Sequence, residues 1–137
     1  MDFFHEKLQD YVKQNGIEGV VFLGYVSDEE LVWLYQNTVT YVFPSLSEGF
    51  GLPGLEAFCF GAPVASSNAT CLPEIYGNAA EYFDPENIKS IEETIDKMLV
   101  DKDLRQKLSV AGKERLKKYS WEKMAKQTHE IYMKAIR

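Results

Sequence analysis

The 137-residue chain has 45% hydrophobic and 26% charged residues, which suits one compact domain, over residues 1–137, with its own core. Its net charge of −6 argues against nucleic acid or an anionic membrane surface as the main partner. No apolar run is long enough to span a bilayer and no signal-type leader is present, so we expect a cytoplasmic chain without a transmembrane segment.

Apolar periodicity and Gly or Pro stops divide the chain into alternating helices and strands. In chain order the expected elements are a helix over Phe3–Val12, a strand over Val20–Leu23, a helix over Ser27–Asn37, a strand over Thr40–Phe43, a helix over Pro53–Phe60, a strand over Pro63–Ser66, a short helix over Leu72–Tyr76, a strand over Glu81–Phe83, and helices over Ile88–Leu99, Leu104–Leu116 and Trp121–Tyr132. Strands that alternate with helices are joined by right-handed crossovers, so we expect a Rossmann-like, three-layer α/β domain with a mostly parallel sheet.

Three segments that follow strands are candidates for a ligand site, because open parallel sheets bind ligands beyond the carboxyl ends of their strands. These segments, which we expect to meet at one edge of the sheet, are Gly24–Ser27, Pro44–Leu52 and Ser66–Pro73. In the second segment, Gly49 and Gly51 remove side chains and let the backbone approach a ligand closely. The helix starting near Pro53 adds N–H groups near Gly54 and Leu55 and a positive dipole end, which suit a phosphate. Taken alone, the same residues fit a tight turn without a ligand equally well.

Two carboxylates flank this turn, Glu48 in the loop and Glu56 in the first helical turn. A carboxylate repels a phosphate, but it accepts two hydrogen bonds and so suits a ribose diol or a pair of sugar hydroxyls. A ligand with both phosphate and hydroxyl-rich parts is a nucleotide sugar. Both residues also have a plain structural interpretation, since Glu56 favours the helix dipole and Glu48 is a loop charge.

Two other enzyme classes use similar residues. GFGLPG, residues 49–54, matches the dinucleotide motif G-x-G-x-x-G, and Glu74 lies at about the distance of the acidic ribose ligand. The motif needs its first glycine directly after a strand, and here a longer loop intervenes, which weakens an NAD-dependent oxidoreductase. A glycoside hydrolase would need the carboxyl groups of Glu48 and Glu56 roughly 5–9.5 Å apart, and it leaves the phosphate-type turn unexplained.

EGFGLPGLE, residues 48–56, resembles the E-x7-E signature of retaining glycosyltransferase family 4, whose members have the GT-B fold. The flanking segments that resemble the same family are FLGYVSDEEL (22–31), GAPVASSNATCLPEIYGNAAEYFDP (61–85) and YSWEKMAKQTHEIY (119–132). The resemblance implies the nucleotide-sugar-binding, C-terminal half of a hexosyltransferase of polysaccharide biosynthesis. The stretch SNATCLPE is similar to bacterial mannosyltransferases and related polysaccharide transferases.

The resemblance also implies roles for individual residues. The implied donor-binding residues are Val26, Glu48, Gly49, Phe50, Gly51, Leu52 and Glu56. Glu48 would be the catalytic carboxylate facing the donor sugar, and Glu56 would hold the ribose. Backbone N–H groups of Phe50 and Gly51 would approach the sugar and that of Leu52 the distal phosphate, while the backbone of Val26 would contact the base.

This chain differs from the family's pattern mainly in lacking two parts of the full-length enzymes. The family's basic G-R…K-G unit, which neutralises the diphosphate, and its N-terminal acceptor domain are both absent from this chain, and His5 and His129 match no family position. The acceptor domain is therefore an expected partner, and we expect the isolated chain to bind nucleotide sugars weakly or not at all and to be inactive. The alternative is a non-catalytic nucleotide-sugar-binding module. For the full-length enzyme, peripheral attachment to the inner membrane face is the alternative to a purely cytoplasmic location.

The sequence predicts no metal site and no cofactor other than the donor substrate. Enzymes of the GT-B fold generally need no divalent metal, and no cluster of metal-ligating residues stands out. Cys59 and Cys71 lack metal-type spacing, so we expect both to be free thiols.

Overall fold

The computed structural model describes residues 3–136. Residues up to Leu31 form one compact unit, and residues from Val32 onward form a second. A single domain over residues 1–137 remains a prediction.

The first unit begins with helix α1 (Phe3–Gln14), and Gly16, with a φ of 61°, follows its end as predicted. The predicted buried strand over Val20–Leu23 is wrong. This segment has no regular secondary structure, and Val21 is 76% exposed. A strand needs a neighbouring strand to pair its N–H and C=O groups, and residues 3–31 contain none.

Helix α2 (Asp28–Asn37) begins at a capping box, as predicted. The Ser27 N–H donates to the Glu30 carboxylate at 2.7 Å, and the Glu30 N–H donates to the Ser27 hydroxyl at 3.3 Å. These bonds satisfy N–H groups that have no partner within the helix. Local sequence therefore sets the start of α2.

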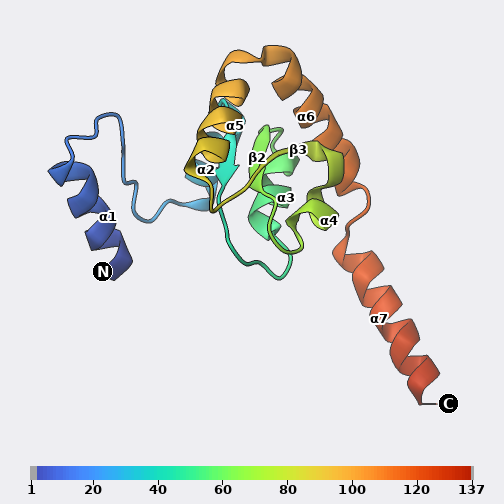
Figure 1. The fold of residues 1–137 in the computed structure, drawn as a ribbon. Helices are drawn as coiled ribbons and strands as arrows, with labels where there is room; N and C mark the ends of the chain where they lie inside the picture. Colours follow the sequence, from blue (N-terminus) through green and yellow to red (C-terminus); the bar gives the residue numbers. More distant parts are fainter. Residues whose placement is uncertain (1–2, 137) are drawn as a thin grey trace. The chain divides into compact units, whose positions relative to one another are not determined.

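The second unit contains a parallel sheet of β1 (Tyr41–Phe43), β2 (Val64–Ser67) and β3 (Ala80–Phe83), in that order (Figure 1). Ala65 of the central strand lies opposite Val42 on one side and Glu81 on the other. All four residues of β2 are buried, because a central parallel strand is covered on both faces. The predicted parallel arrangement is confirmed for these strands.

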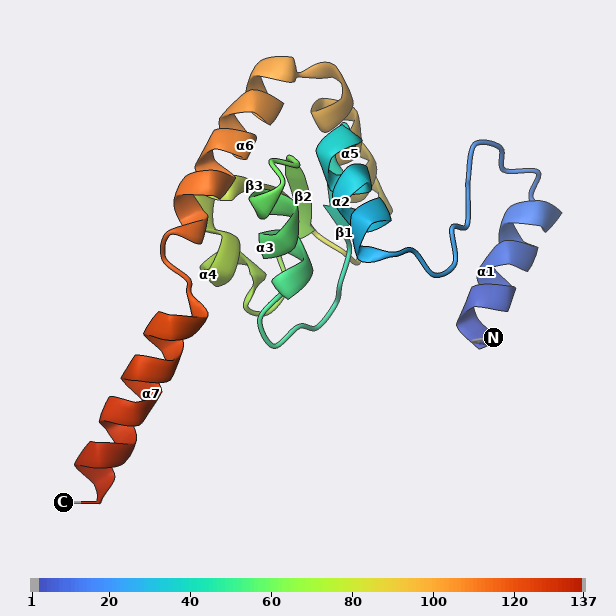
Figure 2. The ribbon, with the colours of Figure 1, turned by 180° about the vertical axis from the view of Figure 1, so that it is seen from behind.

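The remaining elements of this unit are α3 (Leu52–Cys59), α4 (Leu72–Tyr76), the 3-10 turn η1 (Gly77–Ala79), α5 (Ile88–Val100), α6 (Lys102–Leu116) and α7 (Trp121–Ala135). Helix α3 packs against β1 and β2, whereas α5 packs against β2 and β3 (Figures 1 and 2). Asn87, Asp101 and Ser120 cap α5, α6 and α7 with their side chains. No helix within residues 3–136 is both long and apolar enough to cross a membrane.

The core fixes the strands and α3 together. One buried cluster joins the sheet to α5 and α6 and consists of Ala65, Phe83, Met98 and Leu108. On α3, Phe58 is fully buried and packs edge-on against Tyr76, with ring centroids 5.5 Å apart. Helix α6 approaches the Phe58 ring closely, since a Cβ at Gly112 would lie 2.6 Å from that ring. The carboxyl ends of β1 and β2 are thus presented by a packed scaffold.

Candidate functional site

Two loops meet beyond the carboxyl ends of β1 and β2. They are the β1–α3 loop, Pro44–Gly51, and the β2–α4 loop, Asn68–Cys71. The Glu48 N–H donates to the Thr70 hydroxyl at 3.2 Å, and the Cys71 thiol donates to the Glu48 carbonyl at 3.2 Å. The predicted convergence is therefore confirmed for these two segments. The third segment, Gly24–Ser27 with Val26, belongs to the other unit, and its place in the site remains a prediction.

Glu48 is held at a third point by its own side chain. Its Oε1 atom accepts a hydrogen bond from the Ser45 hydroxyl at 2.9 Å, and the residue is half-buried. Its N–H, carbonyl and carboxylate thus all have partners in the protein. This arrangement disfavours the interpretation of Glu48 as a solvated loop charge.

The pKa of the Tyr41 hydroxyl is affected by both predicted carboxylates. Burial raises the pKa of Tyr41 above its ordinary value, Tyr35 raises it further, and the negative charges of Glu56 and Glu48 also contribute. Negative charges raise the pKa of a phenol because they disfavour its ionised form. That Glu48 and Glu56 belong to one site remains a prediction.

Helix α3 starts one residue earlier than predicted, and the set of free N–H groups changes with it. The prediction that Glu56 lies in the first helical turn is wrong, because that turn contains no acidic residue. Gly51 is the N-cap, with a φ of 88° and no side-chain cap. In helix geometry the N-cap carbonyl accepts from the Leu55 N–H, and Pro53 has no N–H. The predicted donors were those of Gly54 and Leu55. The Gly54 N–H bonds to the Tyr76 hydroxyl, so the donor left in the first turn is that of Leu52.

Tyr76 accounts for the glycine at position 51. Its hydroxyl donates to the Gly51 carbonyl at 2.6 Å, and a Cβ at Gly51 would lie 2.5 Å from the hydroxyl oxygen and 2.6 Å from Leu72. Burial raises the pKa of Tyr76, an effect that a backbone hydrogen bond with Gly54 opposes, and the hydroxyl stays protonated at neutral pH. Gly51 is thus required by packing and by its left-handed backbone, independently of any ligand.

Gly49 has no such requirement. A Cβ there would meet nothing within 4 Å, and Gly49 is not among the residues with positive φ. The fold therefore supplies no packing reason for this glycine. Close approach of a ligand to its backbone remains the prediction for Gly49.

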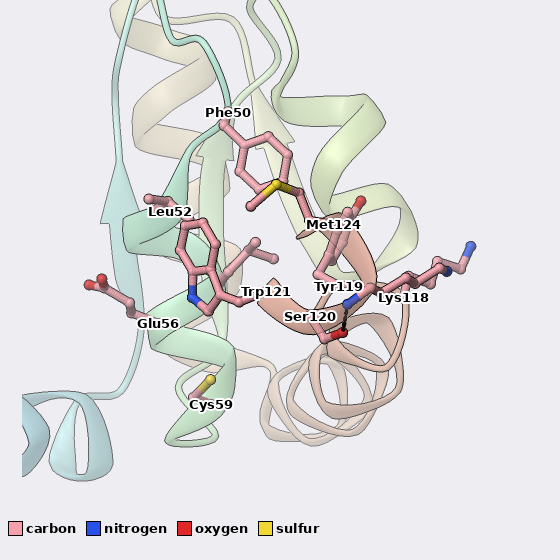
Figure 3. Close-up of a pocket in the computed structure, with 11 residues that line it drawn as sticks. Phe50, Leu52, Glu56, Cys59, Lys118, Tyr119, Ser120, Trp121 and Met124 are labelled. Carbon is pink, nitrogen blue, oxygen red and sulfur yellow. Dashed lines mark hydrogen bonds between the residues drawn. The ribbon is translucent and has the colours of Figure 1, made fainter. Parts of the chain in front are cut away.

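A cavity of about 410 Å³ lies beside the start of α3 (Figure 3). Its lining residues are Phe50, Leu52, Leu55, Glu56, Cys59, Lys118, Tyr119, Ser120, Trp121, Lys123 and Met124. The Phe50 ring packs edge-on against Tyr119, with centroids 5.6 Å apart, whereas the Glu56 carboxylate points away from these two rings. Three predicted site residues thus line the cavity, and Glu48 is not among its lining residues.

The residues that support the predicted ones carry no signal of their own in the sequence. Thr70 and Cys71 lie in a segment predicted to be near the site, and Tyr76 lies in a predicted helix. The sequence around Tyr119 and Trp121 predicts only the start of the last helix. Their proximity to Phe50 follows from the packing of α6 against α3, which no local pattern reveals.

Cys59 and Cys71 are free thiols, as predicted. Within the described part of the chain, no three His, Cys, Asp or Glu residues are grouped as metal ligands would be.

Comparisons with known proteins agree on one family. The sequence model for "Glycosyl transferases group 1" matches residues 4–115. The chain is 41% identical over 126 residues to O-antigen chain mannosyltransferase B of Escherichia coli, covering 91% of this chain and 33% of that protein. It thus spans about one third of the length of this relative.

The fold of this chain resembles those of solved glycosyltransferase structures. Sucrose-phosphate synthase from Thermosynechococcus elongatus superposes with a TM-score of 0.84 at 25% identity, over 96% of this chain and 34% of that chain. The C-terminal domain of a glycosyl transferase group 1 family protein from Francisella tularensis gives 0.70 at 29% identity, over 84% and 61%. The predicted α/β class, with the architecture of GT-B glycosyltransferases, is confirmed.

Proposed function

This chain belongs to the glycosyl transferases group 1 family, and from that premise we propose that it is the donor-binding part of a retaining glycosyltransferase. The observation that carries the proposal is the meeting of two loops beyond the carboxyl ends of β1 and β2, where Ser45, Thr70 and Cys71 hold Glu48 shortly before the start of α3. A helix start without a side-chain cap suits a phosphate, and carboxylates beside it suit sugar hydroxyls. A nucleotide-diphosphate sugar has both groups.

The proposed reaction moves a sugar from the donor to an acceptor hydroxyl. The bond between the anomeric carbon and the diphosphate oxygen breaks, and the diphosphate leaves with the electron pair. The acceptor oxygen bonds to the same face of that carbon and loses its proton. Negative charge builds up on the leaving diphosphate, so N–H groups at the start of α3 would stabilise the transition state.

Each predicted residue has a place in this proposal. Glu48 accepts hydrogen bonds from hydroxyls of the donor sugar, and Glu56 accepts those of the ribose. The backbone at Gly49, Phe50 and Gly51 lies along the sugar, and the Leu52 N–H donates to the distal phosphate. Val26, in the other unit, contacts the base through its backbone.

The donor sugar is proposed to be a hexose such as mannose, because the O-antigen relative is a mannosyltransferase. The acceptor domain and the cations that neutralise the diphosphate are proposed to lie in other parts of the enzyme, on the cytoplasmic side of the membrane. The chain is acidic, with a net charge of −6, so it needs those cations to hold a diphosphate.

Titration with different nucleotides tests this function against a dinucleotide-dependent oxidoreductase. The acidic ribose ligand of such enzymes follows a strand, whereas Glu74 lies in the first turn of α4. We expect calorimetry on the full-length enzyme to detect UDP- or GDP-sugar binding and no NAD binding. Saturable binding of NAD alone would contradict the proposal.

The chain by itself is expected to transfer no sugar, because acceptor binding and diphosphate neutralisation are assigned to other parts of the enzyme. The measurement is release of nucleoside diphosphate from UDP- and GDP-hexoses mixed with candidate acceptors. The full-length enzyme serves as the positive control. Turnover by residues 1–137 alone would show that the chain is a complete catalyst.

Substitution of Glu56 by Gln separates its two interpretations. If Glu56 holds the ribose diol, E56Q in the full-length enzyme should weaken nucleoside diphosphate binding about tenfold, the effect of a weakened charge-assisted hydrogen bond. If it only favours the helix dipole, stability should fall by at most about 1 kcal/mol and binding should not change. Glu93→Gln, at an exposed position of α5, is the control for the lost charge. Calorimetry and thermal unfolding together decide between the two.

A further inference from the structure

We propose that Thr70 and Cys71 are positioning residues that hold Glu48 for recognition of the donor sugar. This inference rests on the proposed function, since it assigns the sugar hydroxyls to Glu48. It goes beyond the E-x7-E motif, because neither residue lies within it. The two residues act on the backbone of Glu48 and not on the donor itself.

The geometry is a two-sided clamp on one residue. The Thr70 hydroxyl accepts from the Glu48 N–H, and the Cys71 thiol donates to the Glu48 carbonyl, both at 3.2 Å. One bond fixes each peptide group adjoining the Glu48 Cα atom. The Ser45 hydroxyl also donates to the Glu48 carboxylate at 2.9 Å. Backbone and side chain of Glu48 are therefore both held in place.

The clamp is anchored in the sheet. In the β2–α4 loop, the Asn68 N–H donates to the Phe83 carbonyl of β3 at 2.9 Å, and the Ala69 N–H donates to the Ser67 hydroxyl at 3.0 Å. Ser67 and Leu72, which flank the loop, are fully buried. Thr70 and Cys71 therefore connect the β1–α3 loop to a loop that is itself fixed to β2 and β3.

Thr70 adopts an unfavourable backbone conformation to make its bond. Its φ is 52°, and it is the one non-glycine residue with positive φ among those described. This left-handed region is costly for a β-branched side chain and persists only where surrounding structure enforces it. Gly or Asn would suit the backbone better, but neither carries a hydroxyl. The strain points to a requirement for the Thr70 side chain.

Sugar recognition needs such a clamp more than diphosphate binding does. A carboxylate selects paired hydroxyls only when its two oxygens are held close to the productive position, and a small displacement weakens both bonds. The diphosphate and ribose are assigned to the start of α3 and to Glu56, which the core and Tyr76 support separately. Loss of the clamp should therefore reduce sugar recognition selectively.

The test measures two affinities of the full-length enzyme by calorimetry, for the nucleotide sugar and for the corresponding nucleoside diphosphate. The variants are Thr70→Val, Cys71→Ala and the double variant T70V/C71A. Thr70→Val keeps the β-branch and its strain and removes only the hydroxyl. We expect the double variant to lose about tenfold in nucleotide-sugar affinity with unchanged diphosphate affinity. Each single variant should lose less, in part because Thr70 is exposed and water can replace its hydroxyl.

Conservative and remote variants serve as controls. T70S/C71S retains an acceptor and a donor and should restore nucleotide-sugar affinity to within about twofold of the wild type. Thr40→Val removes a comparable hydroxyl bond, to the Pro63 carbonyl at 3.2 Å, before β1 and should change neither affinity. Thermal unfolding of every variant shows whether the fold is intact.

The outcomes separate this inference from the proposed function. If the wild type binds no nucleotide sugar, the proposed function fails. If E48Q loses the extra affinity for the sugar while T70V/C71A keeps it, only the positioning role is wrong. Equal loss of both affinities in folded T70V/C71A would also overturn it, because the loop would then support the whole site without selecting the sugar.

Discussion

Replacing Glu48 with Gln in the full-length enzyme is expected to lower the rate of sugar transfer about hundredfold to thousandfold. Gln keeps the shape of the side chain but removes the negative charge and one acceptor. The Ser45 hydroxyl and the donor sugar would then compete for the single remaining side-chain carbonyl oxygen. The effect should fall mainly on kcat if the charge acts on the positive character that develops at the anomeric carbon.

Steady-state kinetics with saturating acceptor provides the measurement, and Glu93→Gln again controls for the change in net charge. Unfolding temperatures should be nearly equal, since Glu48 is only half-buried. A full transfer rate in E48Q would remove Glu48 from the catalytic machinery. If KM instead rose by the same factor while kcat stayed unchanged, Glu48 would act in ground-state binding alone.

Replacing Gly51 with Ala is expected to destabilise the fold by about 2–4 kcal/mol. The new Cβ would lie 2.5 Å from the Tyr76 hydroxyl oxygen and 2.6 Å from the Leu72 side chain, and both residues are fully buried. The φ of 88° adds a backbone penalty that only glycine avoids. Urea unfolding of the chain, followed by circular dichroism, measures the loss.

Gly49→Ala is the matched variant, because the same methyl group would enter open space. Its stability should change by less than about 0.5 kcal/mol. In the full-length enzyme, however, G49A should weaken nucleotide-sugar binding if a donor lies against that backbone. Equal destabilisation by G49A and G51A would contradict the packing explanation of Gly51. Undiminished donor binding by G49A would contradict a role for Gly49.

Elements with strong local signals were predictable from the sequence. The Ser27–Glu30 capping box needs only residues within one turn, and it forms as predicted. The Val20–Leu23 strand failed, because an apolar run predicts burial while strand formation also requires a pairing partner. The start of α3 moved by one residue, because Gly51 takes the N-cap position under the constraint of Tyr76.

The candidate site shows the same division. Sequence alone determined the chemical groups, namely two carboxylates eight residues apart around a glycine-containing turn before a helix, and from them a family resemblance that the comparisons confirm. Those signals are local, because turn conformation and helix capping depend on neighbouring residues. Tertiary structure alone decided that Thr70 and Cys71 hold Glu48 and that Tyr76 requires Gly51. These contacts join residues 22 to 25 positions apart, and hydrogen bonds and close packing between such residues exist only once the parallel strands have aligned their ends.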